Sequence, residues 1–176
     1  MRRIPVLLLF AAAVLAPAFS AQSSDVIVTT VPECLPTTTL DEMVKALDDA
    51  ISGPANKDRT CLRQVLLPEA RLTPMAPLAD GGLAPHTLTV DNWVAMVGSR
   101  GSIPIYERQV KVGIETYGHI AHLWTTYELR PTPDGKATAR GINSIQAVFD
   151  GKRWRVFEIL WQAETREEPV PAKYLP

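Results

Sequence analysis

The chain has 176 residues, of which 46% are hydrophobic, and a formal net charge of −1. This is the composition of one globular domain able to bury a core. The near-neutral charge leaves no basic field for nucleic acid, so nucleic-acid binding is not expected.

The first twenty residues predict a secretory signal peptide. Two arginines precede the apolar run IPVLLLFAAAVLA, and Ala18 and Ser20 stand at the −3 and −1 positions of a cleavage site. The apolar run is too short to span a bilayer. We therefore expect residues 1–20 to be removed, leaving a periplasmic or extracellular protein without a membrane span.

Export changes the meaning of the two cysteines. Cys34 and Cys61 would lie in an oxidising compartment, where a disulfide persists. Such a bridge would close a loop of about 27 residues and stabilise the fold by roughly 3–4 kcal/mol. Two separate buried thiols are the alternative. We favour the bridge because Cys61 falls on a short predicted helix that can pack over the start of the preceding one. Without paired histidines, two cysteines do not indicate zinc.

Residues 21–36 are a polar and β-branched lead-in to one predicted domain over 37–164. Its first helix starts after Thr39, which forms a capping box with Glu42, and it ends at 52–54. The apolar stripe of this helix comprises Leu40, Met43, Val44, Leu47 and Ile51.

Two shorter helices are expected near 59–67 and 89–97, and the second of them buries Trp93. Between them we expect a short strand over 70–75 and a flexible surface loop over 76–88, because that loop contains the run APLADGGLAP.

After residue 103 the hydrophobic period becomes that of strands. Four long strands are expected, over 106–116, 119–130, 140–149 and 152–164. Asp-Gly between the last two is a strong hairpin signal. Helices followed by a meander indicate an α+β fold, with N-terminal helices packed on one face of a curved antiparallel sheet. The Pro-rich tail over 165–176 is expected on the surface.

Alternate residues of a strand point to opposite faces of a sheet, so turn positions predict which residues face the helices. The candidate pocket residues on that face are Arg108, Tyr127, Ser144, Gln146 and Trp161, with Trp93 added from the third helix. The polar groups among them either form a satisfied internal network or orient a ligand, because an unpartnered buried polar group costs roughly 1–3 kcal/mol.

The same register places four large apolar residues on the outer face, which helices would leave uncovered. They are Trp124, Ile145, Trp154 and Leu160. Such a mixture of apolar and polar residues is typical of a subunit interface, so a homodimer through this face is expected.

At this point the sequence resembles the superfamily of nuclear transport factor two, which includes ketosteroid isomerase and the polyketide cyclases. The resemblance covers roughly 37–164 and is carried by the segments TLDEMVKALDDAISGP, YERQVKVGIETYGHIAHLWTTYELR, RGINSIQAVFDGKRWR and EILWQAE. It implies a cone, a cystatin-like α+β roll whose bent sheet wraps helices around a cavity, and often a dimer through the outer face of the sheet. It does not imply one function, because such folds host many.

The sequence gives little indication of a metal site or of a catalytic nucleophile. His119 and His122 are spaced to point to opposite faces of a strand, so they do not form a chelating pair. Ser144 stands in no nucleophile motif and has no visible base. We therefore expect neither a metal nor another cofactor.

Three functions remain open. The first is an exported domain that binds a small amphipathic molecule in an apolar cavity. The second is an isomerase, cyclase or dehydratase that uses Tyr127 with a glutamate. The predicted register puts Glu107, Glu128 and Glu158 on the outer face, although one β-bulge would turn some of them inward. The third is a dimeric structural or accessory module with a filled core.

Overall fold

The computed structural model describes residues 33–101 and 103–176, so the predicted signal peptide and most of the lead-in lie outside the described residues. The helices are α1 (Leu40–Ile51), α2 (Thr60–Val65) and α3 (Val90–Gly98). The strands are β1 (Leu66–Pro77), β2 (Leu83–Pro85), β3 (Leu88–Thr89), β4 (Tyr106–Tyr117), β5 (Ile120–Arg130), β6 (Ala139–Phe149) and β7 (Trp154–Ala163), followed by a short 3-10 helix, η1 (Ala172–Tyr174).

Helix α1 begins and ends with side chains that satisfy its terminal backbone groups. Thr39 and Glu42 form the predicted capping box. At the other end the buried side chain of Arg59 donates to the carbonyl oxygens of Ala50 and Ile51 at 2.8 and 2.6 Å. A cation at a helix C-terminus also interacts favourably with the helix dipole. Both ends of α1 are thus fixed where it crosses the sheet.

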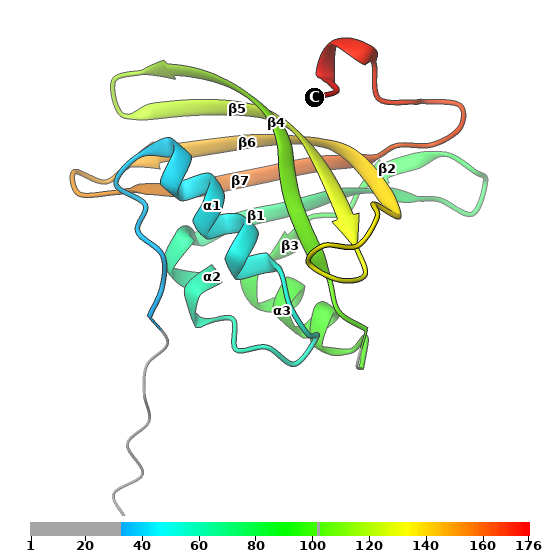
Figure 1. The fold of residues 1–176 in the computed structure, drawn as a ribbon, viewed down its shortest axis with the longest axis horizontal. Coiled ribbons are helices and arrows are strands. Elements are labelled where there is room, and N and C mark those ends of the chain that lie inside the picture. Colours follow the sequence, from blue (N-terminus) through cyan, green and yellow to red (C-terminus); the bar gives the residue numbers. More distant parts are fainter. Residues whose placement is uncertain (1–32, 102) are drawn as a thin grey trace, which may run out of the picture. The chain divides into compact units, whose positions relative to one another are not determined.

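The sheet has the strand order β2-β1-β7-β6-β5-β4, with β3 paired to β1. Figure 1 shows the helices on one face of this bent sheet. The antiparallel meander β4–β7 confirms the predicted α+β fold. The strand expected over 70–75 is present within the longer β1, which joins the sheet parallel to β7. The expectation of a loop over 76–88 was wrong, because this segment contains a β1–β2 hairpin.

Three shifts of one residue change which face parts of the meander present, compared with the predicted register. Val110 and Phe157 are extra residues at β-bulges in β4 and β7. The β5–β6 connection aligns Tyr127 with Gly141, one residue away from the predicted partner Ile142. Because side chains alternate, a shift of one residue moves a strand's side chains to the opposite face.

These shifts exchange several residues between the faces. Asn143 and Ile145 face the helices, where Ile145 is fully buried, while Ser144 and Gln146 face outward. The prediction that Ser144 and Gln146 face the helices is therefore wrong. The placement of Ile145 and Trp154 on the outer face is also wrong, because Trp154 packs against the buried core.

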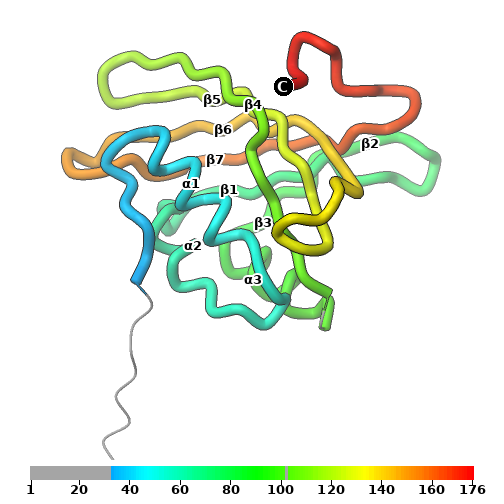
Figure 2. Tube along the Cα trace, in the orientation of Figure 1, coloured from blue at the N-terminus to red at the C-terminus, as the bar shows by residue number. Residues whose placement is uncertain are grey.

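Trp124 and Leu160 do lie on the outer face, and each is 40% exposed. The C-terminal tail returns across this face, as the red segment in Figure 2 shows. Near its end the Tyr174 ring lies 5.9 Å from that of Trp124, and Lys111 Nζ donates to the Leu175 carbonyl at 2.7 Å. The tail is thus at the surface, as predicted, but it is held against the sheet.

The disulfide between Cys34 and Cys61 is present, with the two Cα atoms 5.3 Å apart. It ties the segment before α1 to α2, which confirms the predicted pairing. None of the helices in the described part of the chain is long and apolar enough to cross a membrane.

Candidate functional site

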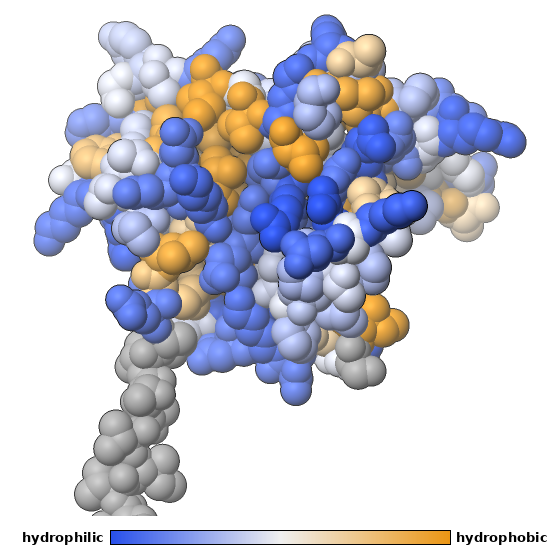
Figure 3. Space-filling model, in the orientation of Figure 1, coloured by the Kyte–Doolittle hydropathy of each residue, from blue (hydrophilic) through white to orange (hydrophobic). Residues whose placement is uncertain are grey.

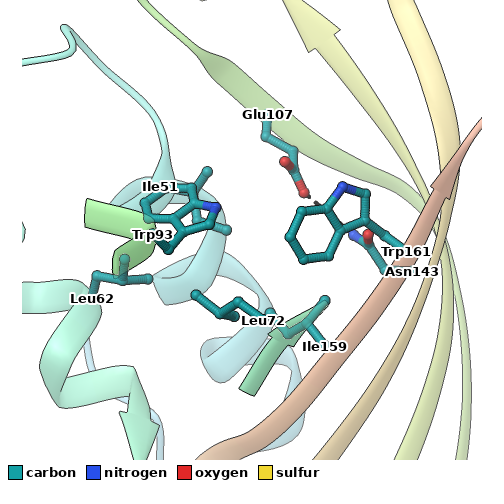
Figure 4. A pocket seen from close by; sticks show the side chains of 8 residues that line it. All are labelled: Ile51, Leu62, Leu72, Trp93, Glu107, Asn143, Ile159 and Trp161. Carbon is teal, nitrogen blue, oxygen red and sulfur yellow. Dashed lines mark hydrogen bonds between the residues drawn. The ribbon is translucent and has the colours of Figure 1, made fainter. Parts of the chain in front are cut away.

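The candidate site is built around Glu107, which the bulge at Val110 turns toward the helices. Figure 4 shows its carboxyl group pointing into a cavity between the sheet and the helices, beside Trp161 and Asn143. The cavity has a volume of about 40 Å³ and is lined by Ile51, Leu62, Leu72, Trp93, Glu107, Asn143, Ile159 and Trp161. Glu107 is the one ionisable group in this otherwise mostly apolar lining.

A hydrogen-bond network fixes the Glu107 carboxyl group. Its Oε1 accepts from Gln109 Nε2 at 2.9 Å and from Asn143 Nδ2 at 3.3 Å. The same Gln109 nitrogen donates to Asp48 Oδ1 at 3.2 Å, so one amide bridges two carboxyl groups. Thr125 and Asn143 in turn donate to Gln109 Oε1, which fixes the orientation of that amide.

The environment raises the pKa of both carboxyl groups. Burial, followed by the nearby charge of Asp48, raises the pKa of Glu107 to about 7. Burial also raises the pKa of Asp48 to about 6, against the lowering effect of its hydrogen bonds from Gln109 and of the Arg108 charge. Near neutral pH, Glu107 is therefore able both to take up and to release a proton.

Tyr127 adds a hydroxyl group close to these carboxyl groups. It is buried, and its pKa is raised first by burial and then by the charge of Glu107. Within the described residues its hydroxyl makes no hydrogen bond. The ring lies against Gly141 on β6, where a Cβ atom would be 2.5 Å from Tyr127 Oη. Tyr127 is therefore a neutral hydroxyl group for which the described residues supply no acceptor.

An open groove meets the site from the solvent side. Its volume is about 540 Å³, within the range of small-molecule sites. Asp48 and Glu107 both line it, and Lys45, Tyr106 and Arg108 lie around them. Glu107 thus lines both the groove and the inner cavity, and its carboxyl group points into the cavity.

The structure brings together some of the residues predicted from sequence and separates others. Trp93 and Trp161 line the cavity, whereas Tyr127 is buried against Gly141 and lines neither the cavity nor the groove. Arg108 is exposed and lines the groove. Ser144 and Gln146 lie on the other side of the sheet, where Ser144 Oγ is 3.2 Å from His122 Nε2.

Sequence reasoning missed the carboxyl pair and its two amides. Glu107 was named but assigned outward, and its inward position depends on a bulge that leaves no mark in the sequence. The inward position of Asp48 could have been predicted from the sequence. Asp48 lies one helical turn after Val44 and one turn before Ile51, so all three residues share the buried side of α1. The other two glutamates considered do not reach the site. Glu128 pairs with Arg130 at 2.7 Å, and Glu158 lies opposite the outward-facing Gln146.

Metal binding has no visible site in the described ranges. Among residues 33–101 and 103–176, no three His, Cys, Asp or Glu side chains gather in a way that could hold a metal ion.

No protein-family model and no curated protein matches the sequence. Among solved structures, the chain is similar to a protein of unknown function with a cystatin-like fold from Nostoc punctiforme PCC 73102, with 8% identity, coverage of 72% of this chain and 90% of that one, and a TM-score of 0.55. It is also similar to a protein from Kribbella flavida, with 15% identity, coverage of 72% and 88%, and a TM-score of 0.51.

An NTF-2-like protein of unknown function from Silicibacter pomeroyi DSS-3 is 16% identical over 71% of this chain and 92% of that one, with a TM-score of 0.49. At such identities the two likenesses with TM-scores above 0.5 show the fold alone. The fold is thus the cystatin-like α+β fold that the resemblance to the nuclear transport factor two superfamily predicted.

Proposed function

We propose that the protein binds a small molecule in the groove and catalyses a proton transfer on it, with Glu107 as the acid–base group. The observation that carries this proposal is the Glu107 carboxyl, held by two amides between an apolar cavity and an open groove, with a pKa of about 7. A carboxyl with a strongly shifted pKa in a cleft is a physical indicator of a catalytic site.

The chemistry that fits is abstraction of a proton from carbon next to a carbonyl group. Ionised Glu107 takes the proton, the electron pair of the C–H bond moves onto the carbonyl oxygen, and a hydroxyl donor such as Tyr127 stabilises the resulting enolate. Protonated Glu107 then returns the proton to a different carbon, or the enolate expels a leaving group. Isomerases, cyclases and dehydratases share this first step.

A structural or accessory role is the second candidate, and the small inner cavity favours it. A volume of about 40 Å³ accommodates a few water molecules and no larger ligand. In that case Glu107, Asp48, Gln109 and Asn143 would be an internal polar network that fixes α1 on the sheet. Only the observation that a molecule bound in the groove reacts would exclude this structural role.

The test uses nitrobenzisoxazole, whose ring opens when a base removes one carbon-bound proton. The N–O bond breaks, and a coloured cyano-nitrophenolate forms. We expect the wild type to catalyse this opening, and Glu107→Gln to lower kcat/KM by about 100-fold or more. Glu115→Gln, an exposed glutamate on the same strand, is the matched control and should retain the rate. Equal rates for wild type and Glu107→Gln would contradict the proposal.

We further propose that the protein acts after export. The predicted signal peptide motivates this, and the disulfide between Cys34 and Cys61 supports it because such bonds persist in oxidising compartments.

A further inference from the structure

A second groove of ligand size lies on the opposite face of the sheet, beneath the C-terminal tail. Its volume is about 470 Å³, more than ten times that of the inner cavity. The sheet contributes Trp124, Ile142 and Leu160 to its lining, and the tail contributes Val170. In Figure 3, apolar side chains gather over the β4–β5 hairpin and next to the tail.

The tail is fixed to the sheet at both ends of this groove. At the near end, Val170 N donates to Glu164 Oε1 at 3.0 Å, and the Gln162 side chain donates to Glu168. At the far end, the Thr126 hydroxyl donates to the carbonyl of Tyr174. The tail segment between these points forms one wall of the groove.

The charged residues that line this groove are all acidic. They are Glu164 and Glu168, and none of the described lysines, arginines or histidines lines it. Glu164 is paired with Arg140 at 3.5 Å, whereas Glu168 lies on the exposed side and accepts from Gln162. A carboxylate has lone pairs for several donors, so Glu168 retains capacity for a bound cation. The half-exposed ring of Trp124, which lies 5.9 Å from that of Tyr174, adds apolar surface for the body of a molecule that carries such a cation.

We propose that this groove binds a small apolar molecule that carries an ammonium group. The apolar body lies against Trp124 and Leu160 under the tail, and the ammonium group interacts with Glu168. The site is on the other face of the sheet from Glu107, and Trp161 is the one residue that lines both this groove and the inner cavity.

The experiment is calorimetric titration of the full mature chain with three naphthalenes that carry, at the same ring position, an aminomethyl, a hydroxymethyl or a carboxylate group. The expected order of affinity is amine, then alcohol, then carboxylate. Glu168→Gln should weaken binding of the amine by about tenfold and leave that of the alcohol unchanged. Glu167→Gln, the neighbouring glutamate that does not line the groove, should change neither. Salt should reduce the difference between amine and alcohol.

One further variant keeps the test decisive. Leu160→Lys places a cation in the floor of the groove and should abolish binding of the amine, with the fold verified by circular dichroism. The proposal is overturned if the amine does not bind saturably, if it binds no better than the carboxylate, or if Leu160→Lys binds it as wild type does. It is also overturned if sedimentation shows a dimer that must dissociate before the amine binds, because the groove would then be a subunit interface.

Discussion

The ring of Tyr127 lies against Gly141 on the neighbouring strand, at the one place in β6 where the backbone carries no side chain to block it. A Cβ atom at Gly141 would lie 2.5 Å from Tyr127 Oη and 2.2 Å from the carbonyl oxygen of Gln162. Neither contact is possible without movement, and the second involves backbone. The glycine therefore sets the position of the tyrosine relative to Glu107.

We expect Gly141→Ala to destabilise the fold by roughly 2–3 kcal/mol, because overpacking forces side chains and backbone to shift. Chemical denaturation measures this. Gly113→Ala is the matched control, since its Cβ would meet only the carbonyl oxygen of Trp124, at 3.6 Å. The control should be neutral or slightly stabilising because alanine favours a strand more than glycine does. If the two variants were equally stable, the Tyr127 ring and the neighbouring backbone could shift without cost, and the prediction would be wrong.

The raised pKa of Glu107 makes stability depend on pH. An ordinary glutamate has a pKa of 4.5, and in the folded chain that of Glu107 is about 7, so the folded state binds more protons between these values. Glu107 therefore favours folding most below pH 4.5, and this contribution falls as pH rises and is lost above about pH 7. The difference amounts to roughly 3 kcal/mol.

Glu107→Gln removes this dependence because an amide does not titrate. At pH 8 the variant should be more stable than wild type by roughly 3 kcal/mol, and at pH 4 the two should be similar. Denaturant melts at the two pH values measure the difference. Asp48 adds a smaller fall between about pH 4 and 6 in both proteins, in line with its raised pKa of about 6. If Glu107→Gln were less stable than wild type at pH 8, the hydrogen bonds to the ionised Glu107 carboxylate would more than offset the cost of burying its charge, which would contradict the prediction.

The helices and strands could be predicted because their signals are local. Thr39 and Glu42 identify the start of α1, and Asp150 with Gly151 identifies the last hairpin. The hairpin turn itself is longer than predicted, pairing Phe149 with Trp154, because Asp150 accepts hydrogen bonds from the backbone N–H groups of Lys152 and Arg153. The Asp-Gly pair therefore predicts where the turn lies but not how many residues it contains.

The faces of the strands could not be predicted with the same success, because register is a property of the whole sheet. The bulge at Val110 turned Glu107 inward, and the β5–β6 connection exchanged Asn143 with Ser144. A bulge requires no particular residue, so nothing in the composition of β4 marks it. The polar residues of the candidate site, Glu107, Gln109 and Asn143, have faces that depend on these shifts, which is why they were assigned outward, whereas its apolar residues Ile51, Leu62, Trp93, Ile159 and Trp161 were placed inward.

The exported protein should begin near Ala21 and carry the bridge between Cys34 and Cys61. Intact mass spectrometry should show the loss of residues 1–20 and a deficit of two protons. The double variant Cys34→Ser/Cys61→Ser should lose roughly 3–4 kcal/mol, because the 27-residue separation closes a long loop in the unfolded chain. Free thiols in exported protein, or a stability unchanged by the double variant, would remove the support that the disulfide gives to export.

The homodimer predicted through the outer sheet face stays a prediction, and the tail now competes for the same surface. Trp124 and Leu160 remain outside, but both line the groove that the tail covers. If a second copy and the tail use one surface, a chain that ends at Glu164 should self-associate more strongly than the full chain. Sedimentation over a range of micromolar concentrations tests this. Equal association of both chains would place any interface elsewhere.

Asp48 should set the pH at which the proposed base becomes active. Its charge is the second cause, after burial, of the raised pKa of Glu107. Asp48→Asn removes that charge and keeps an oxygen to accept from Gln109 N, which now donates to Asp48 Oδ2 at 3.0 Å. The pKa of Glu107 should then fall below 7 but stay above the ordinary value of 4.5, because burial remains.

In the nitrobenzisoxazole assay the inflection of kcat/KM against pH should move to lower pH accordingly. Asp41→Asn, an exposed aspartate on the same helix, should leave the inflection near pH 7. An inflection unmoved by Asp48→Asn but absent in Glu107→Gln would keep Glu107 as the base and show that burial alone sets its pKa.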